Sequence, residues 1–411
     1  MTAQQDPPPY RFTGAAAPYA GGDPYADHRA ADLPFTRYTD LADRRLGAGV
    51  VAANDEFFAP RENLLVPGPA EFHPGDFGHK GKVMDGWETR RRRGASAGRP
   101  GPEEDEHDWA LVRLGAPGVI HGVVVDTAHF RGNHPRAVSV EATAVPGSPS
   151  PGELLAAGVR WTALVPRTEV GGHAANGFAV ADRRRFTHVR LRQYPDGGIA
   201  RLRVHGEVVP DPAWLAALGG FDVVALEHGG RVEDASDRFY SPPGNTIMPG
   251  RSRRMDDGWE TRRRRDRGHD WITYRLAERA RLTALEIDTA CLKGNAAGWA
   301  SVSVRDDGDA GDGGGHQGED GGHAREDGGR AGEGAGDHPG ARSGGAWREV
   351  LYRTRLQPDT NHRFALPAAV VGTHARLDVY PDGGISRLRL FGALTDDGAA
   401  RLRARHQRPH G

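Results

Sequence analysis

DGWETRRRR, residues 85–93, recurs letter for letter at residues 257–265, and this duplication decides how the chain is organised. Three further blocks occur twice in the same order. They are NDEFFAPRENLL (54–65) with SDRFYSPPGNTI (236–247), VDTAHFRGN (125–133) with IDTACLKGN (287–295), and YPDGGIARLRVHG (194–206) with YPDGGISRLRLFG (380–392). A chain of 411 residues is also long for one core. The sequence therefore predicts two related domains in tandem.

The spacing of the blocks sets the expected domain bounds. Copy one runs from about 34 to 208 and copy two from about 221 to 394. Between them, in a linker at 209–220, DPAWLAAL predicts a short helix with Asp211 as N-cap and Pro212 at the first helical position. Compositions poor in groups that can be buried predict a disordered arm at 1–33 and a disordered insert at 306–345. Residues 395–411 are predicted to form a C-terminal tail.

Both copies carry the pattern of β-strands. In HVRLRQY (188–194) and ARLDVY (375–380), apolar and polar residues alternate with the period of two typical of a half-buried strand. Short apolar runs such as GVIHGVVVDTA end at polar turns, and no long helical period appears in either copy. The expected fold is all-β, a tandem repeat of two antiparallel β-sandwiches.

Composition argues against several classes of function. Lys and Arg number 54 against 55 acids, so the net charge of −1 gives no general attraction to nucleic acid or an anionic membrane. The single cysteine, Cys291, excludes an intramolecular disulfide and a multi-cysteine zinc site. Neither a signal peptide nor an apolar run of about 18 residues is visible, so we expect a cytoplasmic protein. No HExxH motif is present, so no cofactor is predicted and a metal requirement is left open.

The arginines of the duplicated stretch have two interpretations. In a strand, Arg90 and Arg92 would share one face, and Arg262 and Arg264 would do the same in copy two. A buried guanidinium needs carboxylate or carbonyl partners, which these arginines could find in an ion-pair lattice or in a substrate. The candidate carboxylates are Glu88, Asp108 and Asp126 in copy one, and Glu260, Asp270 and Asp288 in copy two.

Polar turns at the ends of the predicted strands carry the remaining candidates. His107 and His269 of the HDW blocks could be acid–base groups or structural side chains. In the PDGG turns, glycine is expected to adopt positive φ while Asp196 or Asp382 accepts turn amides. Arg201 and Arg387 just beyond could reach a ligand carboxylate. Four tryptophans are expected to be core or cleft walls: Trp87, Trp109, Trp259 and Trp271.

Taken together, these blocks resemble the allantoicase (allantoate amidinohydrolase) family across both copies, about 34–394. The resemblance implies two jelly rolls of the galactose-binding or discoidin-like type, and hydrolysis of allantoate to ureidoglycolate and urea in allantoin and purine degradation. It also implies a homo-oligomer. The copies differ at His129, Arg131 and His134, which correspond to Cys291, Lys293 and Ala296, so a difference in role between the copies is expected there.

Breaking a C–N bond of allantoate needs a guanidinium for the carboxylate, an acid for the departing urea and a base for water. The predicted catalytic residues are Glu88, His107, Asp108, Glu260, His269 and Asp270. The predicted substrate-binding residues are Arg90, Arg92, Asp126, Asn133, Arg201, Arg262, Arg264, Asp288, Lys293, Asn295 and Arg387. The alternatives are a non-catalytic tandem jelly-roll protein that binds a carbohydrate or small ligand, and an arginine-rich nucleic-acid binder.

Overall fold

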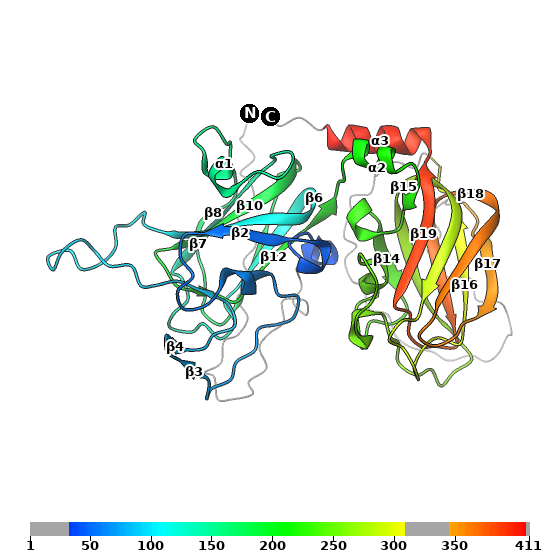
Figure 1. The fold of residues 1–411 in the computed structure, drawn as a ribbon, viewed down its shortest axis with the longest axis horizontal. Helices are drawn as coiled ribbons and strands as arrows, with labels where there is room; N and C mark the ends of the chain where they lie inside the picture. The colour runs from blue at the N-terminus through cyan, green and yellow to red at the C-terminus, as the bar shows by residue number, and fades with distance from the viewer. Residues whose placement is uncertain (1–32, 309–344, 408–411) are drawn as a thin grey trace, which may run out of the picture.

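The computed structural model describes residues 33–308 and 345–407. The expected disorder of the N-terminal arm and of the insert concerns residues that lie, apart from a few at their edges, outside this described part of the chain. The described residues form two β-rich bodies side by side, repeat 1 and repeat 2, one for each copy of the duplicated blocks (Figure 1). The expected tandem of antiparallel β-sandwiches is confirmed.

Repeat 1 is organised around the long strand β6 (Asp108–Asp126). Its first part pairs with β2 and β10, and its last part pairs with β9 and β12, so this strand connects the two layers of the sandwich. The other strands and the α-helix of this repeat are β1 (Thr39–Asp40), β2 (Gly49–Ala53), β3 (Phe77–Gly78), β4 (Gly81–Lys82), β5 (Trp87–Glu88), β7 (Ala137–Thr143), α1 (Pro151–Leu155), β8 (Thr162–Glu169), β9 (Ala175–Ala179), β10 (Arg185–Tyr194), β11 (Gly198–Ile199) and β12 (Arg201–Val208).

Repeat 2 has the same plan around β15 (Asp270–Asp288), which pairs with β14, β18 and β19. One continuous strand, β18 (Asn361–Tyr380), takes the place of β9 and β10 of repeat 1. The remaining strands are β13 (Phe221–Asp222), β14 (Arg231–Ala235), β16 (Trp299–Arg305), β17 (Arg348–Arg355) and β19 (Arg387–Leu394).

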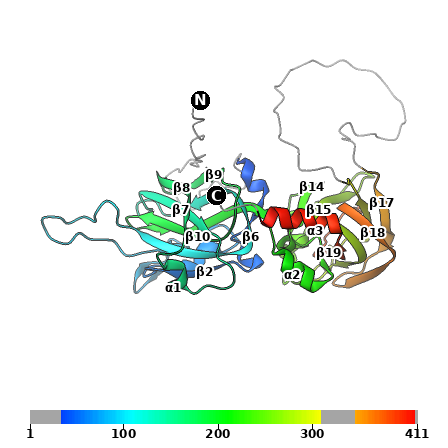
Figure 2. The same ribbon diagram turned by 90° about the horizontal axis from the view of Figure 1, so that it is seen from above.

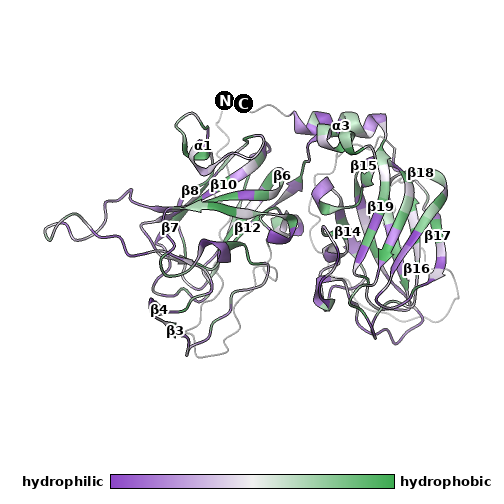
Figure 3. Ribbon diagram, viewed as in Figure 1, coloured by the Kyte–Doolittle hydropathy of each residue, from purple (hydrophilic) through white to green (hydrophobic). Residues whose placement is uncertain are grey.

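The alternating pattern seen in the sequence is the burial pattern of the strands. Val189 and Leu191 on β10 are fully buried, and so are Leu377 and Val379 on β18. Hydrophobic residues concentrate along the strands, whereas the loops below them are largely hydrophilic (Figure 3). Each repeat therefore keeps its own apolar core, and the polar groups that could perform chemistry are displaced to the loops.

A short helix joins the repeats, as predicted. It is α2 (Pro212–Leu218), and the Asp211 side chain caps it by accepting from the Ala213 amide. A second helix, α3 (Asp396–His406), occupies part of the expected C-terminal tail and lies along repeat 2 (Figure 2). Leu46, Val119 and Val209 pack into the apolar cluster of repeat 2. The two cores are thus in contact, while the domain bounds derived from the sequence stay a prediction.

Candidate functional site

The duplicated stretch, hereafter the nonapeptide, is anchored by its tryptophan. Trp87 is fully buried, and its indole N–H donates to the Asp55 carbonyl oxygen at 2.7 Å. In repeat 2, Trp259 is also fully buried and donates to the Asp237 carbonyl at 2.9 Å. A buried indole needs a partner for its N–H, so this contact fixes where each nonapeptide enters the loop end of its sandwich.

The arginine run is not the strand that its spacing suggested. Strand β5 ends at Glu88, and the residues after it have no regular structure. Arg90 nevertheless pairs with Asp55 at 2.8 Å, and Arg92 pairs with Asp108 at 2.7 Å. The Arg92–Asp108 pair is one that the sequence proposed. Asp55 is a partner that the sequence reasoning missed, although its block is duplicated.

Repeat 2 reproduces these ion pairs. Arg262 pairs with Asp237 at 2.8 Å, and Arg264 pairs with Asp270 at 3.0 Å. Asp108 and Asp270 were predicted as catalytic, but each is at least 96 % buried at the side chain and is held by its arginine. A buried carboxylate neutralised in this way orders the loop, and the catalytic role of both aspartates stays a prediction.

The PDGG turns close over the same stretch. Gly197 and Gly383 have φ of 145° and 122°, the positive values that favour glycine, as expected. The expected acceptor role of the turn aspartate needs a correction. Asp196 accepts from the amide of Arg92, and Asp382 from that of Arg264, both at 2.7 Å and both across to the nonapeptide. The turn therefore supplies hydrogen-bond acceptors for backbone amides of the arginine run, which has no strand partner there.

Arg201 and Arg387, which were expected to reach a ligand carboxylate, are held by groups of the protein. Arg201 is 1 % exposed and bonds Asp85 through both terminal nitrogens, at 2.9 and 2.6 Å. Carbonyls of Gly68, Pro69 and Ala200 take its other N–H groups. Arg387, 3 % exposed, is held in the same way by Asp257 at 3.1 Å and by backbone carbonyls. All five donors of Arg201 are used within the protein, so it closes the loop, and substrate binding by either arginine stays a prediction.

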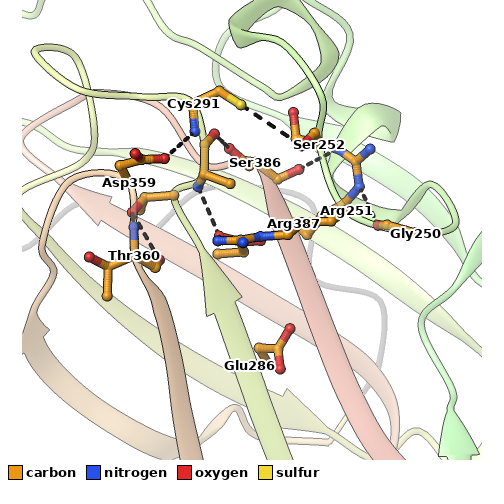
Figure 4. Close-up of polar contacts among 12 residues, drawn as sticks. Gly250, Arg251, Ser252, Glu286, Cys291, Asp359, Thr360, Ser386 and Arg387 are labelled. Carbon is orange, nitrogen blue, oxygen red and sulfur yellow. Dashed lines mark hydrogen bonds and ion pairs between the residues drawn. The ribbon is translucent and has the colours of Figure 1, made fainter.

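Asp126 and Asp288 are also buried, and each accepts from the amide two residues ahead. The turns that they cap hold His129 and Cys291 at φ of 65° and 66°. Asp288 additionally pairs with Arg251 at 2.9 Å. In Figure 4 the Cys291 amide points to Asp359, to which it donates at 2.8 Å. Both aspartates thus shape the loop end, and direct binding of substrate by either stays a prediction.

Glu88 and Asn133 are two predicted site residues that the fold brings into contact. The Asn133 side-chain amide donates to Glu88 Oε1 at 2.9 Å. Burial raises the pKa of the Glu88 carboxyl above its ordinary value, against the Asn133 hydrogen bond and the charge of Arg91, which lower it. Arg91 is exposed and was not among the predicted residues. A half-buried carboxyl with a raised pKa beside a guanidinium suits an acid–base role.

The corresponding residues of repeat 2 are arranged differently. Within the described part of the chain, the Glu260 carboxylate and the Asn295 side chain make no hydrogen bond, and Lys293 is exposed. The two histidines also stand in separate contacts. His107 Nδ1 lies 2.8 Å from the Asp105 carbonyl, and His269 Nε2 lies 2.8 Å from Asp378. Their acid–base role stays a prediction.

Two tandem β-sandwiches with paired polar loop ends define a class of duplicated β-proteins, and comparison with known proteins narrows it. The family model described as the allantoicase repeat matches residues 39–209 and again 221–395. The chain belongs to the allantoicase family. A probable allantoicase of Streptomyces coelicolor is 70% identical over 407 residues, covering 99% of both chains. A probable allantoicase of Nocardia farcinica is 47% identical over 370 residues, covering 90% of this chain and 98% of that one.

The fold is likewise similar to that of a solved member. The crystal structure of allantoicase from Saccharomyces cerevisiae aligns with a TM-score of 0.67 at 29% identity, over 87% of this chain and 93% of that chain. Among the described residues, no helix is long and apolar enough to cross a membrane. No group of three or more candidate metal-ligating side chains occurs among those residues either.

Proposed function

We propose that this protein hydrolyses allantoate to ureidoglycolate and urea, the reaction that membership of the allantoicase family implies. The observation that carries the proposal is the match of both repeats, in order, to the allantoicase repeat. Relatives as close as 70% identity over the whole chain carry the same description. The polar loop ends described above are consistent with an amidinohydrolase, because they place a carboxyl, an amide and guanidinium groups together.

The reaction can be written with carboxyl, amide and guanidinium groups alone. A protonated carboxyl gives its proton to the nitrogen of one ureido group, and the bond between that nitrogen and the central carbon breaks with its electron pair leaving on urea. The lone pair of the other ureido nitrogen stabilises the carbon as an iminium. Water then attacks this carbon and returns a proton to the carboxylate, which yields ureidoglycolate. Glu88 or Glu260 is the carboxyl in this scheme.

The substrate carboxylate needs a cation throughout. Arg90 and Arg262 keep side chains that are 67% and 63% exposed although each also pairs with an aspartate. Arg92 and Arg264 are only 29% and 26% exposed, and each pairs with a buried aspartate. We therefore place the carboxylate near Arg90 or Arg262, with the amides of Asn133 or Asn295 available to the ureido oxygens.

The direct test is release of urea and ureidoglycolate from allantoate by the purified full-length protein, with and without a chelator. Equal amounts of the two products are expected. A protein that releases neither, even after metals are restored, would contradict the proposal and favour the binding-module alternative. We also propose that the protein is cytoplasmic and forms a homo-oligomer. Size-exclusion chromatography with light scattering would test the oligomeric state.

A further inference from the structure

The two copies of the nonapeptide are identical in sequence, yet their glutamates have different surroundings. We propose that proton transfer occurs in repeat 1, with Glu88 as the catalytic residue and Asn133 as its positioning residue, and that repeat 2 is a supporting copy. This inference rests on the proposed hydrolysis of allantoate and assigns it to one half of the molecule.

The first observation is the pairing of the side chains. Asn133 donates to Glu88 Oε1 at 2.9 Å, whereas Asn295 and Glu260 make no such bond within the described residues. The turns are otherwise alike, because Gly198 donates to the Asn133 carbonyl and Gly384 to the Asn295 carbonyl, both at 2.7 Å. The turn therefore stands in the same place in both repeats, and only in repeat 1 does its amide hold the carboxyl.

The second observation is how firmly the glutamate backbone is held. Glu88 pairs with Gly198 of β11 on one side and exchanges backbone hydrogen bonds with Ala59 on the other. In repeat 2 the only backbone pairing at the corresponding place, within the described chain, is a single bridge at Trp259, and the Glu260 amide donates to the Ser241 hydroxyl instead. A carboxyl that transfers protons must be held in one position, and the Glu88 backbone meets that demand better.

The third observation is a segment that only repeat 1 has. The offset between the copies falls from 182 to 172 across this region, so repeat 1 carries ten extra residues there, and they contribute the β3–β4 hairpin. This segment lines an open cavity of about 220 Å³ with Asn63 and Asp85, next to the nonapeptide. Phe72 from the same segment stacks on His129 with 5.3 Å between the ring centroids. The ten extra residues thus give repeat 1 side walls at its loop end.

The fourth observation is the use of the equivalent side of repeat 2. Arg45 of repeat 1, held by Asp43, donates to Asn245 of repeat 2 at 3.2 Å. Asn245 in turn donates to the carbonyl of Gly258 inside the second nonapeptide. Glu227 stands at the position of repeat 2 that corresponds to Arg45. The second nonapeptide is therefore part of the contact between the repeats, which suits a supporting copy.

The chain supplies its own matched variants for the test. Glu88→Gln is expected to lower kcat about 100-fold or more, the usual range for loss of an acid–base group. The loss for Glu260→Gln is expected to be at least about 30-fold smaller, and Glu349→Gln, on the exposed face of β17, is the control for the substitution itself. The midpoint of thermal unfolding of all three variants is expected to stay close to that of the wild type, so that the loss of kcat reports on chemistry.

Asn133→Ser, compared with Asn295→Ser, tests the positioning role through the pH profile of kcat. Because the Asn133 hydrogen bond lowers the pKa of Glu88 and Arg91 is the charged group acting on it, loss of Asn133 is expected to move the Glu88-dependent limb to higher pH. Asn295→Ser is expected to leave that limb in place. A merely structural role of Asn133 would lower kcat without moving the limb.

Three results would overturn the assignment to repeat 1. They are equal losses for Glu88→Gln and Glu260→Gln, a greater loss for Glu260→Gln, and full activity of Glu88→Gln. In each case the wild type still hydrolyses allantoate and the proposed function stands. A wild-type protein that forms no product is a different outcome, because it removes the proposed function together with the inference.

Discussion

Asp222 in repeat 2 offers a quantitative test of how burial controls charge in this fold. Its side chain lies under β19, where it accepts from the Leu390 amide at 2.9 Å and lies 3.3 Å from Arg389. Burial raises the pKa of Asp222 to about 6, against these partners, which lower it. The folded protein therefore keeps a proton that the unfolded chain releases near its ordinary value of 3.8. Stability from this group is present below pH 4 and is lost as pH rises through 6.

The size of the effect follows from the separation of the two pKa values. About two pH units at 1.36 kcal/mol each give about 3 kcal/mol, of which roughly half is lost above pH 5. Asp222→Asn removes the titration. Its free energy of unfolding should therefore gain about 1.5 kcal/mol relative to wild type when the pH is raised from 5 to 7.5.

Urea unfolding followed by circular dichroism at the two pH values measures this difference. The contributions of the other titrating groups to the free energy of unfolding cancel when the two proteins are compared. Asp256→Asn is the matched control, since it removes the same charge from an aspartate that is exposed. If Asp222→Asn and Asp256→Asn respond to pH alike, the burial argument for Asp222 is refuted.

Three further outcomes are expected. Asp85→Asn should lower the free energy of unfolding by about 3 kcal/mol, because it leaves the buried guanidinium of Arg201 without its charge partner. Asp257→Asn should cost less, because the ion pair between Asp257 and Arg387 is longer. Equal costs for the two variants in chemical denaturation would contradict this reasoning. Arg45→Ala should cost about 1–2 kcal/mol through the contact between repeats, against under about 0.5 kcal/mol for Arg44→Ala, whose ion pair with Glu62 is exposed. His107→Gln should keep turnover within about threefold, measured as urea release, because its ring nitrogen is bound to a carbonyl; a loss near 100-fold would return it to the proton-transfer scheme.

Features with a local physical cause could be predicted from the sequence. The alternation around Val189 and Leu191 predicts strand β10, and the PDGG turns predict positive φ at glycine. The N-cap at Asp211 predicts helix α2. Each of these depends on residues within a few positions of one another, so the sequence alone contains the signal.

Features that depend on distant partners could not be predicted from the sequence. Arg201 was expected to face a ligand, but the carbonyls of Gly68 and Pro69, more than 130 residues earlier, enclose it. Asp55 was overlooked as the partner of Arg90, although its duplication in the NDEFFAP block was a usable signal. The contact of Asn133 with Glu88 likewise joins loops that only the folded sandwich brings together.

The identity of the two nonapeptides is explained by the framework that each builds. Asp85 pairs with the buried Arg201, and Trp87 fills the core and bonds a carbonyl. Gly86 leaves no room for a side chain, since a Cβ there would lie 2.6 Å from the Phe130 ring. These letters of the stretch therefore serve the framework of the fold, whether or not the copy is catalytic.

It follows that identity between the nonapeptides says little about which repeat performs chemistry. Within the stretch, Glu88 is the residue whose surroundings depend on a hydrogen bond that repeat 2 does not reproduce in its described residues. The informative differences therefore lie outside the stretch, where His129 and Arg131 are replaced by Cys291 and Lys293. A duplicated framework with one differentiated loop end lets one repeat keep the geometry of the fold while the other meets the narrower demands of proton transfer.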